Sequence, residues 1–207
     1  MRYLTLLLAF SLSAAFAAPP KLVITSQYQD GRDRVVEVRN DSEIAVTAFR
    51  VGASDTIAIN ADMLLGAHEG RILGTGDTAE VRIAGAGEAE AHVFAAIFED
   101  GTTEGDSVSL ARLLNDRHDV AEQIRFALTL LHNENVNRSS ASTVANWFSF
   151  WRERWQASDP TRQVPVAVAA ETYLKQAGNE TATRPARELA EIFEELSAKL
   201  AASQPHL

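Results

Sequence analysis

The chain has no cysteine among its 207 residues. It therefore forms no disulfide, and thiol catalysis, zinc–cysteine sites and iron–sulfur clusters are excluded. After its first residues the chain also lacks any apolar run that approaches the ~20 residues of a membrane-spanning helix. Stability must then come from the burial of apolar side chains. Since 46% of the residues are hydrophobic, the chain can build one large core or two small ones.

Basic residues are also scarce. The chain has 19 Lys and Arg against 28 Asp and Glu, a formal net charge of −9. The deficit lies in the first half, where residues 18–106 hold 7 basic and 16 acidic side chains, while residues 107–207 hold 11 and 12. An acidic surface repels nucleic acids and anionic membranes alike. We therefore expect no nucleic-acid partner.

The N-terminus has the layout of a secretory signal peptide. Arg2 precedes an apolar run over residues 4–12, and Ala15-Phe16-Ala17 provides small residues at the positions that signal peptidase requires. We expect residues 1–17 to be removed by a cut between Ala17 and Ala18. The mature protein is then expected to be periplasmic or secreted, soluble, and without a membrane span.

Residues 21 to about 98 have the texture of β-structure. Short runs rich in β-branched and aromatic residues are bounded by Gly, Asn, Asp or Ser; they cover residues 22–25, 35–38, 44–49, 81–83 and 92–98. Asp30-Gly31 is typical of a hairpin turn between the first two runs. Short strands at this spacing, with no helix between them, predict an antiparallel immunoglobulin-like β-sandwich over residues 18–106.

From Asp106 onward the apolar residues follow a helical period. Asp106 or Ser107 can cap a first helix, Ser139 or Ser140 a second, and prolines near residues 165 and 185 are typical of the first turns of two more. We expect an α-helical region of three or four helices over residues 107–200, followed by a frayed tail over residues 201–207. The predicted fold class is therefore α+β, a β-sandwich followed by helices.

An acidic stretch at residues 97–106, I-F-E-D-G-T-T-E-G-D, is the first candidate site. If Asp100 takes position 1 of a calcium-binding loop, Glu104 takes position 5, but position 12 is Ala111 instead of the bidentate Glu that the loop requires. The simpler interpretation is the end of a strand, a turn at Asp100 and a helix cap at Asp106. A weak calcium or partner site that includes Asp100 and Glu104 is the alternative.

The tryptophans are the second candidate site. All three in the chain, Trp147, Trp151 and Trp155, are four residues apart and so share one face of a helix, with Phe150 beside them and Arg154 at the edge. This face is either an aromatic platform for a sugar, a peptide or a protein, or the centre of the helical core. The sequence leaves both interpretations open.

Motifs for catalysis or cofactor binding are absent. The five histidines form no H-E-x-x-H or H-x-H pair, and no G-x-S-x-G sequence occurs. Residues 74–79 match the loose pattern G-x-G-x-x-A, but a dinucleotide site requires a helix after the glycines, and here another strand is expected. The sequence therefore assigns no catalytic residue, no metal ligand and no cofactor.

Two segments resemble a known group of proteins. Residues 38–49 resemble an N-x-S…I-T-A strand–turn–strand, and residues 98–106 resemble an F-x-D-G-T-x-x-G-D strand end. Together they are similar to uncharacterised small bacterial exported proteins in which an immunoglobulin-like domain precedes helices. The resemblance implies this fold and export. We therefore expect a non-enzymatic protein-interaction module of the bacterial cell envelope, which binds another envelope protein. The alternative is a hydrolase or carbohydrate-binding protein with a site between the sandwich and the aromatic helix.

Overall fold

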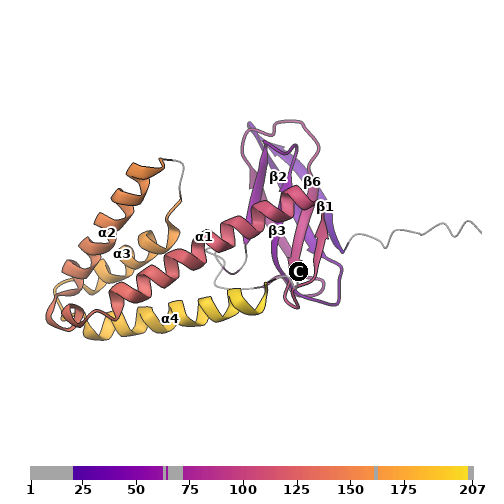
Figure 1. The fold of residues 1–207 in the computed structure, drawn as a ribbon. Coiled ribbons are helices and arrows are strands. Elements are labelled where there is room, and N and C mark those ends of the chain that lie inside the picture. Colours follow the sequence, from indigo (N-terminus) through magenta and orange to yellow (C-terminus); the bar gives the residue numbers. More distant parts are fainter. Residues whose placement is uncertain (1–20, 63, 65–71, 161–162, 205–207) are drawn as a thin grey trace, which may run out of the picture.

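A computed structural model describes residues 21–62, 64, 72–160 and 163–204 (Figure 1). The predicted signal peptide at residues 1–17 lies outside this part and stays a prediction. Within the described ranges, seven strands form two antiparallel sheets, and four α-helices follow them in the chain. The predicted α+β class, with strands first and helices second, is confirmed.

The strands are β1 (Leu22–Asp30), β2 (Asp33–Asn40), β3 (Val46–Gly52), β4 (Ala58–Asp62), β5 (Thr78–Ile83), β6 (His92–Phe98) and β7 (Thr103–Gly105). One sheet has the order β1-β2-β5 and the other β4-β3-β6-β7, and all of the pairings are antiparallel. The sequence predicted five of these strands. The two that it missed, β4 and β7, are short strands at the edges of the second sheet.

The two sheets share one apolar core. Val36 and Val38 of β2, Phe49 of β3 and Phe98 of β6 are fully buried in it. Because successive side chains of a strand point to opposite faces, the alternate residues of β3 and β6 face away from this core. There Ala48, Ala95 and Ile97 form a second cluster with Leu113 of the first helix. Every residue of β3 is buried for this reason.

The helices are α1 (Ser107–Leu131), a 3-10 turn (Glu134–Arg138), α2 (Ala141–Ser158), α3 (Pro165–Ala177) and α4 (Thr183–Ala202). The predicted caps are confirmed: the Asp106 carboxylate accepts the N–H groups of Val108 and Ser109 at 3.0 and 2.9 Å, and Ser140 caps α2. Over the described ranges, none of these helices combines the length and hydropathy needed to cross a membrane.

Helix α1 belongs to both halves of the protein. Its 25 residues span about 37 Å, and Figure 1 shows it running from the sheets into the group formed by α2, α3 and α4. Near its start, Leu113 packs on the four-stranded sheet. Further along, Ile124, Ala127 and Leu131 are buried in the helical core. The change of period at Asp106 therefore marks a junction that α1 crosses as one continuous element.

Helix α4 extends past the expected boundary at residue 200. It continues to Ala202, and Ser203, which the sequence placed in a frayed tail, is 2% exposed. Its hydroxyl group and its carbonyl oxygen accept hydrogen bonds from the guanidinium of Arg117 in α1. The C-terminal end of α4 is thereby held against α1.

Glu171 of α3 holds a buried charge between two helices. Its side chain is 8% exposed, with Lys175 Nζ 2.5 Å from Oε1 and Arg152 Nη1 of α2 3.0 Å from Oε2. The hydrogen bond from Lys175 outweighs the opposing effect of burial, and the nearby charge of Arg152 acts in the same direction as Lys175. The pKa of Glu171 is therefore below its ordinary value of 4.5.

A lowered carboxyl pKa in the folded state stabilises the protein above the unfolded-state pKa, and this contribution is lost as the pH falls through the folded-state value. We therefore expect the melting temperature of the wild type to fall more steeply than that of Glu171→Gln below about pH 4.5. Thermal melts between about pH 7 and about pH 3 measure this. Glu191→Gln, which alters an exposed pair with Arg187 on α4, is the matched control and should follow the wild type. Equal slopes for wild type and Glu171→Gln would contradict the prediction.

Candidate functional site

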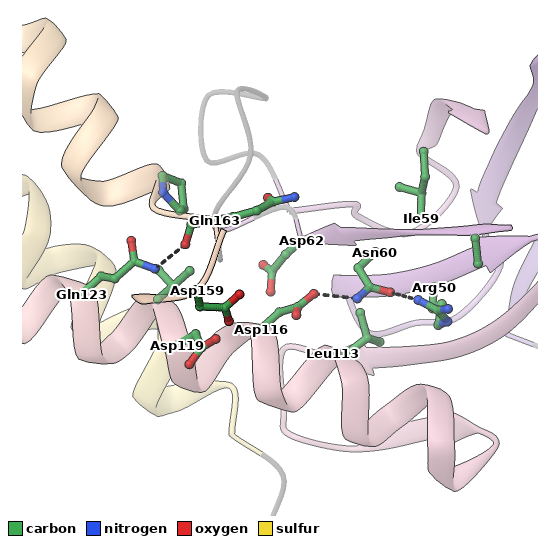
Figure 2. Close-up of a pocket in the computed structure, with 13 residues that line it drawn as sticks. Arg50, Ile59, Asn60, Asp62, Leu113, Asp116, Asp119, Gln123, Asp159 and Gln163 are labelled. Atoms are coloured by element: carbon green, nitrogen blue, oxygen red, sulfur yellow. Dashed lines mark hydrogen bonds between the residues drawn. The ribbon is translucent and has the colours of Figure 1, made fainter. Parts of the chain in front are cut away.

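A polar cleft lies where the β-half meets the helices. It has a volume of about 880 Å³ and is lined by β4, α1 and the segment between α2 and α3 (Figure 2). Four carboxylates line it, those of Asp62, Asp116, Asp119 and Asp159. The alternative that the sequence left open was a site between the sandwich and the aromatic helix. This cleft lies mainly against α1, and no tryptophan is among the described residues that line it, so the alternative stays a prediction.

The carboxylates of this cleft are engaged with neighbouring side chains. Asp116 Oδ2 accepts from Asn60 Nδ2 at 2.6 Å, and Asp62 Oδ2 accepts from Arg117 Nε at 2.6 Å. Asp119 and Asp159 also interact with other residues. Among the residues that the structure describes, no group of three His, Cys, Asp or Glu side chains is placed to hold a metal ion. The arrangement is that of a polar junction between elements.

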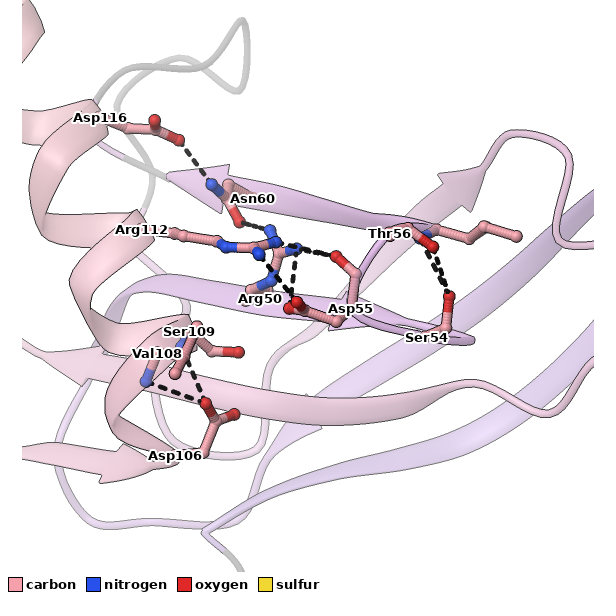
Figure 3. Close-up of polar contacts among 11 residues, drawn as sticks. Arg50, Ser54, Asp55, Thr56, Asn60, Asp106, Val108, Ser109, Arg112 and Asp116 are labelled. Atoms are coloured by element: carbon pink, nitrogen blue, oxygen red, sulfur yellow. Dashed lines mark hydrogen bonds and ion pairs between the residues drawn. The ribbon is translucent and has the colours of Figure 1, made fainter.

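The polar contacts continue from the cleft into the β3–β4 hairpin (Figure 3). Arg50 is 5% exposed, and it donates to Asn60 Oδ1 at 2.6 Å and to the carbonyl oxygen of Asp55 at 2.7 Å. Arg112 of α1 reaches the same Asp55, with Nη2 2.7 Å from Oδ2. Asn60 is therefore fixed on both sides, by Arg50 and by Asp116. These contacts attach the hairpin to α1.

Arg117 is the central residue of this junction. Its guanidinium is 4% exposed and donates to Asp62 of β4, to Thr47 Oγ1 of β3 at 2.9 Å and to Ser203 Oγ at 3.0 Å. One side chain from α1 thus joins the four-stranded sheet and the end of α4. A buried charge is tolerated only when its donors are satisfied, and each nitrogen of this guanidinium has an acceptor.

The tryptophans line a separate groove, of about 400 Å³, between α1 and α2. We call it the aromatic groove; it is lined by Phe126, Leu130, Trp147, Phe150, Trp151, Arg154 and Trp155. Trp151 is 4% exposed and belongs to the helical core, whereas Trp147 and Trp155 are half-buried against that core. The inner side of the tryptophan face is therefore core, as the second interpretation expected, whereas its outer side is open; the aromatic platform stays a prediction.

The open side of the groove is unusually apolar for a protein surface. Phe150 is 65% exposed and Phe126 is 40% exposed. The ring of Phe126 lies 4.6 Å from that of Trp151, centroid to centroid, and the Trp151 and Trp155 rings meet edge to face at 5.1 Å. Large exposed aromatic side chains gathered at one groove are typical of a binding surface.

Two polar groups in the groove have no partner within the described part of the chain. The Nε1–H of Trp151 is buried and makes no hydrogen bond. Arg154 forms no ion pair there, and no Asp or Glu lines the groove. The groove of this acidic protein therefore offers aromatic faces and a cation, and one of its tryptophans keeps a buried donor without a partner.

The structure does not bring Asp100 and Glu104 to the tryptophans. Asp100 Oδ1 accepts from the N–H and hydroxyl groups of Thr102, and these bonds, led by the hydroxyl, place the pKa of Asp100 below its ordinary value. Glu104 accepts from the backbone N–H of Lys21. Asp100 lies in the β6–β7 turn and Glu104 in β7, both in the β-half, whereas α2 lies toward the other end of α1 (Figure 1).

The tryptophans and the polar cleft do not form one site. The residues that line the cleft and those that line the aromatic groove share no member in the described ranges. Sequence analysis missed the contribution of α1 to the groove, which comes from Phe126 and Leu130. Their spacing of four residues, which places both on one side of a helix, was the available signal.

No family model, no curated protein and no solved structure matches this chain.

Proposed function

We propose that this protein is an exported, non-enzymatic interaction module of the bacterial cell envelope, and that it binds another envelope protein through the aromatic groove. The observation that carries the proposal is the exposure of Phe150 and Phe126 beside two half-buried tryptophans. Interfaces between proteins are enriched in Trp, Phe and Arg at their centres. All three residue types line this groove.

The export part of the proposal rests on the N-terminal pattern and on the resemblance to bacterial exported proteins. We further propose that the two sheets form an immunoglobulin-like sandwich. Their shared core and all-antiparallel pairing support this architecture. In this proposal the sandwich carries the helices, and α1, fixed to it by Arg117, holds the groove in place.

A carbohydrate-binding or hydrolytic function is the second candidate. The polar cleft of about 880 Å³ with its four aspartates favours it. A hydrolase would need two of these carboxylates in different environments, one as acid and one as base. Asp62 is committed to Arg117 and Asp116 to Asn60, so the cleft supports the second candidate less than the groove supports the first.

Crosslinking from the groove tests the first candidate. A photoactivatable benzoylphenylalanine replaces Phe150 in the full chain, which is expressed in a bacterial host and irradiated in intact cells. We expect export, a mature chain that begins at Ala18, and a crosslink to one identified envelope protein. Trp147→Ala should reduce its yield about tenfold, the effect of removing one interface hot spot.

The matched control places the same photoactivatable residue at Ile192, which is 52% exposed on α4 outside the groove. This position should give no crosslink to the same partner. Equal crosslinking from both positions, a crosslink only to a second copy of this chain, or retention of the chain in the cytoplasm would each contradict the proposal.

A further inference from the structure

The walls of the aromatic groove limit what can occupy it. Both walls are helices, α1 and α2, whose backbone groups are hydrogen-bonded within each helix. The groove therefore offers no sheet edge to which a partner strand could be added. An occupant must satisfy its own backbone groups or leave them in water. An α-helix and a polyproline II segment both meet this condition.

The dimensions of the groove fit a short extended segment. Trp147 and Trp155 are eight residues apart on α2, which corresponds to about 12 Å along the helix. A polyproline II chain rises about 3.1 Å per residue, so about four of its residues span this length. Proline-rich segments bind aromatic-lined grooves in this conformation, with little loss of conformational entropy.

The unused donor separates the two possible occupants. Trp151 Nε1 is buried and has no acceptor in the described part of the chain. The carbonyl oxygens of a helix are already bonded within the helix, whereas those of a polyproline II segment are free. A polyproline II segment therefore presents free carbonyl oxygens as acceptors along its whole length, and a helix does not. A carbonyl oxygen reaches this buried atom only if a neighbouring side chain moves. We take Phe126 as that side chain, since its ring is 40% exposed and lies 4.6 Å from that of Trp151, centroid to centroid.

Charge adds the last element of recognition. Arg154 is exposed at the groove, and among the described residues no carboxylate pairs with it or lines the groove, although the chain carries a net charge of −9. A partner segment with an acidic residue would complement this cation. A basic segment would be drawn to the acidic remainder of the surface instead.

We propose that the aromatic groove binds an extended, proline-containing segment of the partner protein, with a backbone carbonyl oxygen accepting from Trp151 Nε1 and an acidic side chain paired with Arg154. This inference rests on the proposed function, and names the chemistry of the segment that the partner presents.

Intrinsic fluorescence tests the proposal directly, because all three tryptophans of the chain line the groove. The probe is a capped nonapeptide of three Pro-Pro-Glu repeats, whose glutamates align along one edge of a threefold helix. We expect a saturable shift of the tryptophan emission when the exported, mature chain is titrated with it.

Variants of the groove residues show which side chains contact the peptide. Phe150→Ser should weaken peptide binding about tenfold, and Arg154→Gln about two- to fivefold at low salt. Trp151→Phe, which keeps a ring and removes the donor, should weaken it about two- to tenfold. Ile192→Ser, on α4, is the matched control and should bind as the wild type does.

Three outcomes overturn the proposal: no saturable shift, tighter binding of an amphipathic helical peptide of equal charge, or binding of an oligosaccharide in place of the peptide. If the peptide fails while the crosslink from position 150 still identifies an envelope protein, the inference is wrong and the proposed function stands. If both experiments fail, the proposed function is wrong as well.

Discussion

Replacing Arg117 with methionine is expected to lower the free energy of unfolding by about 3–5 kcal/mol, the cost of removing one partner of a buried ion pair. The guanidinium is 4% exposed, and the Asp62 carboxylate that it binds is 10% exposed. Without this guanidinium, the Asp62 carboxylate loses its ion pair in a site shielded from water, and Thr47 Oγ1 and Ser203 Oγ lose their donor. Urea denaturation, followed by far-UV circular dichroism, measures the change.

Two further variants show whether burial causes this loss. Arg112→Met removes the exposed ion pair with Asp55 from the same helix, and should cost less than about 1 kcal/mol. The double variant Arg117→Met/Asp62→Leu should recover part of the loss, since an apolar pair often replaces a buried ion pair at little cost. Recovery will be incomplete because Asp62 Oδ1 also accepts the N–H of Leu64. Equal losses for Arg112→Met and Arg117→Met would show that Arg117 is not a buried anchor.

Arg117 also shows what sequence alone could not predict. It is one of eleven basic residues in the second half of the chain, and nothing in its neighbours marks it as buried. Its partners come from β3, β4 and the end of α4, and these are far from it in sequence. A residue whose role depends on such distant contacts carries no local pattern.

Local signals explain what was predicted correctly. Asp106 and Ser140 cap α1 and α2 through contacts made within a few residues, so the positions where these two helices begin could be predicted. The short strands β4 and β7 are defined by their pairing with β3 and β6. Neither has a β-branched run of its own, and both were therefore missed.

The sequence also predicted part of the aromatic groove. Spacing by four residues placed Trp147, Trp151 and Trp155 on one face of α2, which the structure confirms. How far each ring is buried depends on the packing of α1 against α2, and this is a tertiary property. The open outer side, with Phe126 on one wall and Phe150 on the other, required the structure.

Replacing Gly105 with alanine is expected to be about as damaging as removing Arg117. Gly105 has a φ of +111°, a backbone conformation that costs other residues about 1–3 kcal/mol. A methyl group there would also overlap the backbone of Phe94 and Ala95 in β6. Because the overlapped atoms belong to the backbone, they cannot move aside as a flexible side chain could, and we expect the overlap to add about 1–3 kcal/mol, as overpacking does. We expect a loss of about 3 kcal/mol or more, measured by urea denaturation.

The close approach of Gly105 to the backbone of β6 positions the residue that caps α1. It brings the N–H of Asp106 to 3.0 Å from the carbonyl oxygen of Phe94, at the point where Asp106 caps α1. Gly31 provides the matched control, because its φ is +63° and a methyl group there meets no atom within 4 Å. Gly31→Ala should cost only about 1 kcal/mol, the strain of the left-handed conformation. Equal losses at the two positions would mean that the conformation alone matters. A larger loss at Gly105 would show that the close approach to β6, at the end of the acidic stretch first considered as a calcium loop, adds to the cost of the conformation.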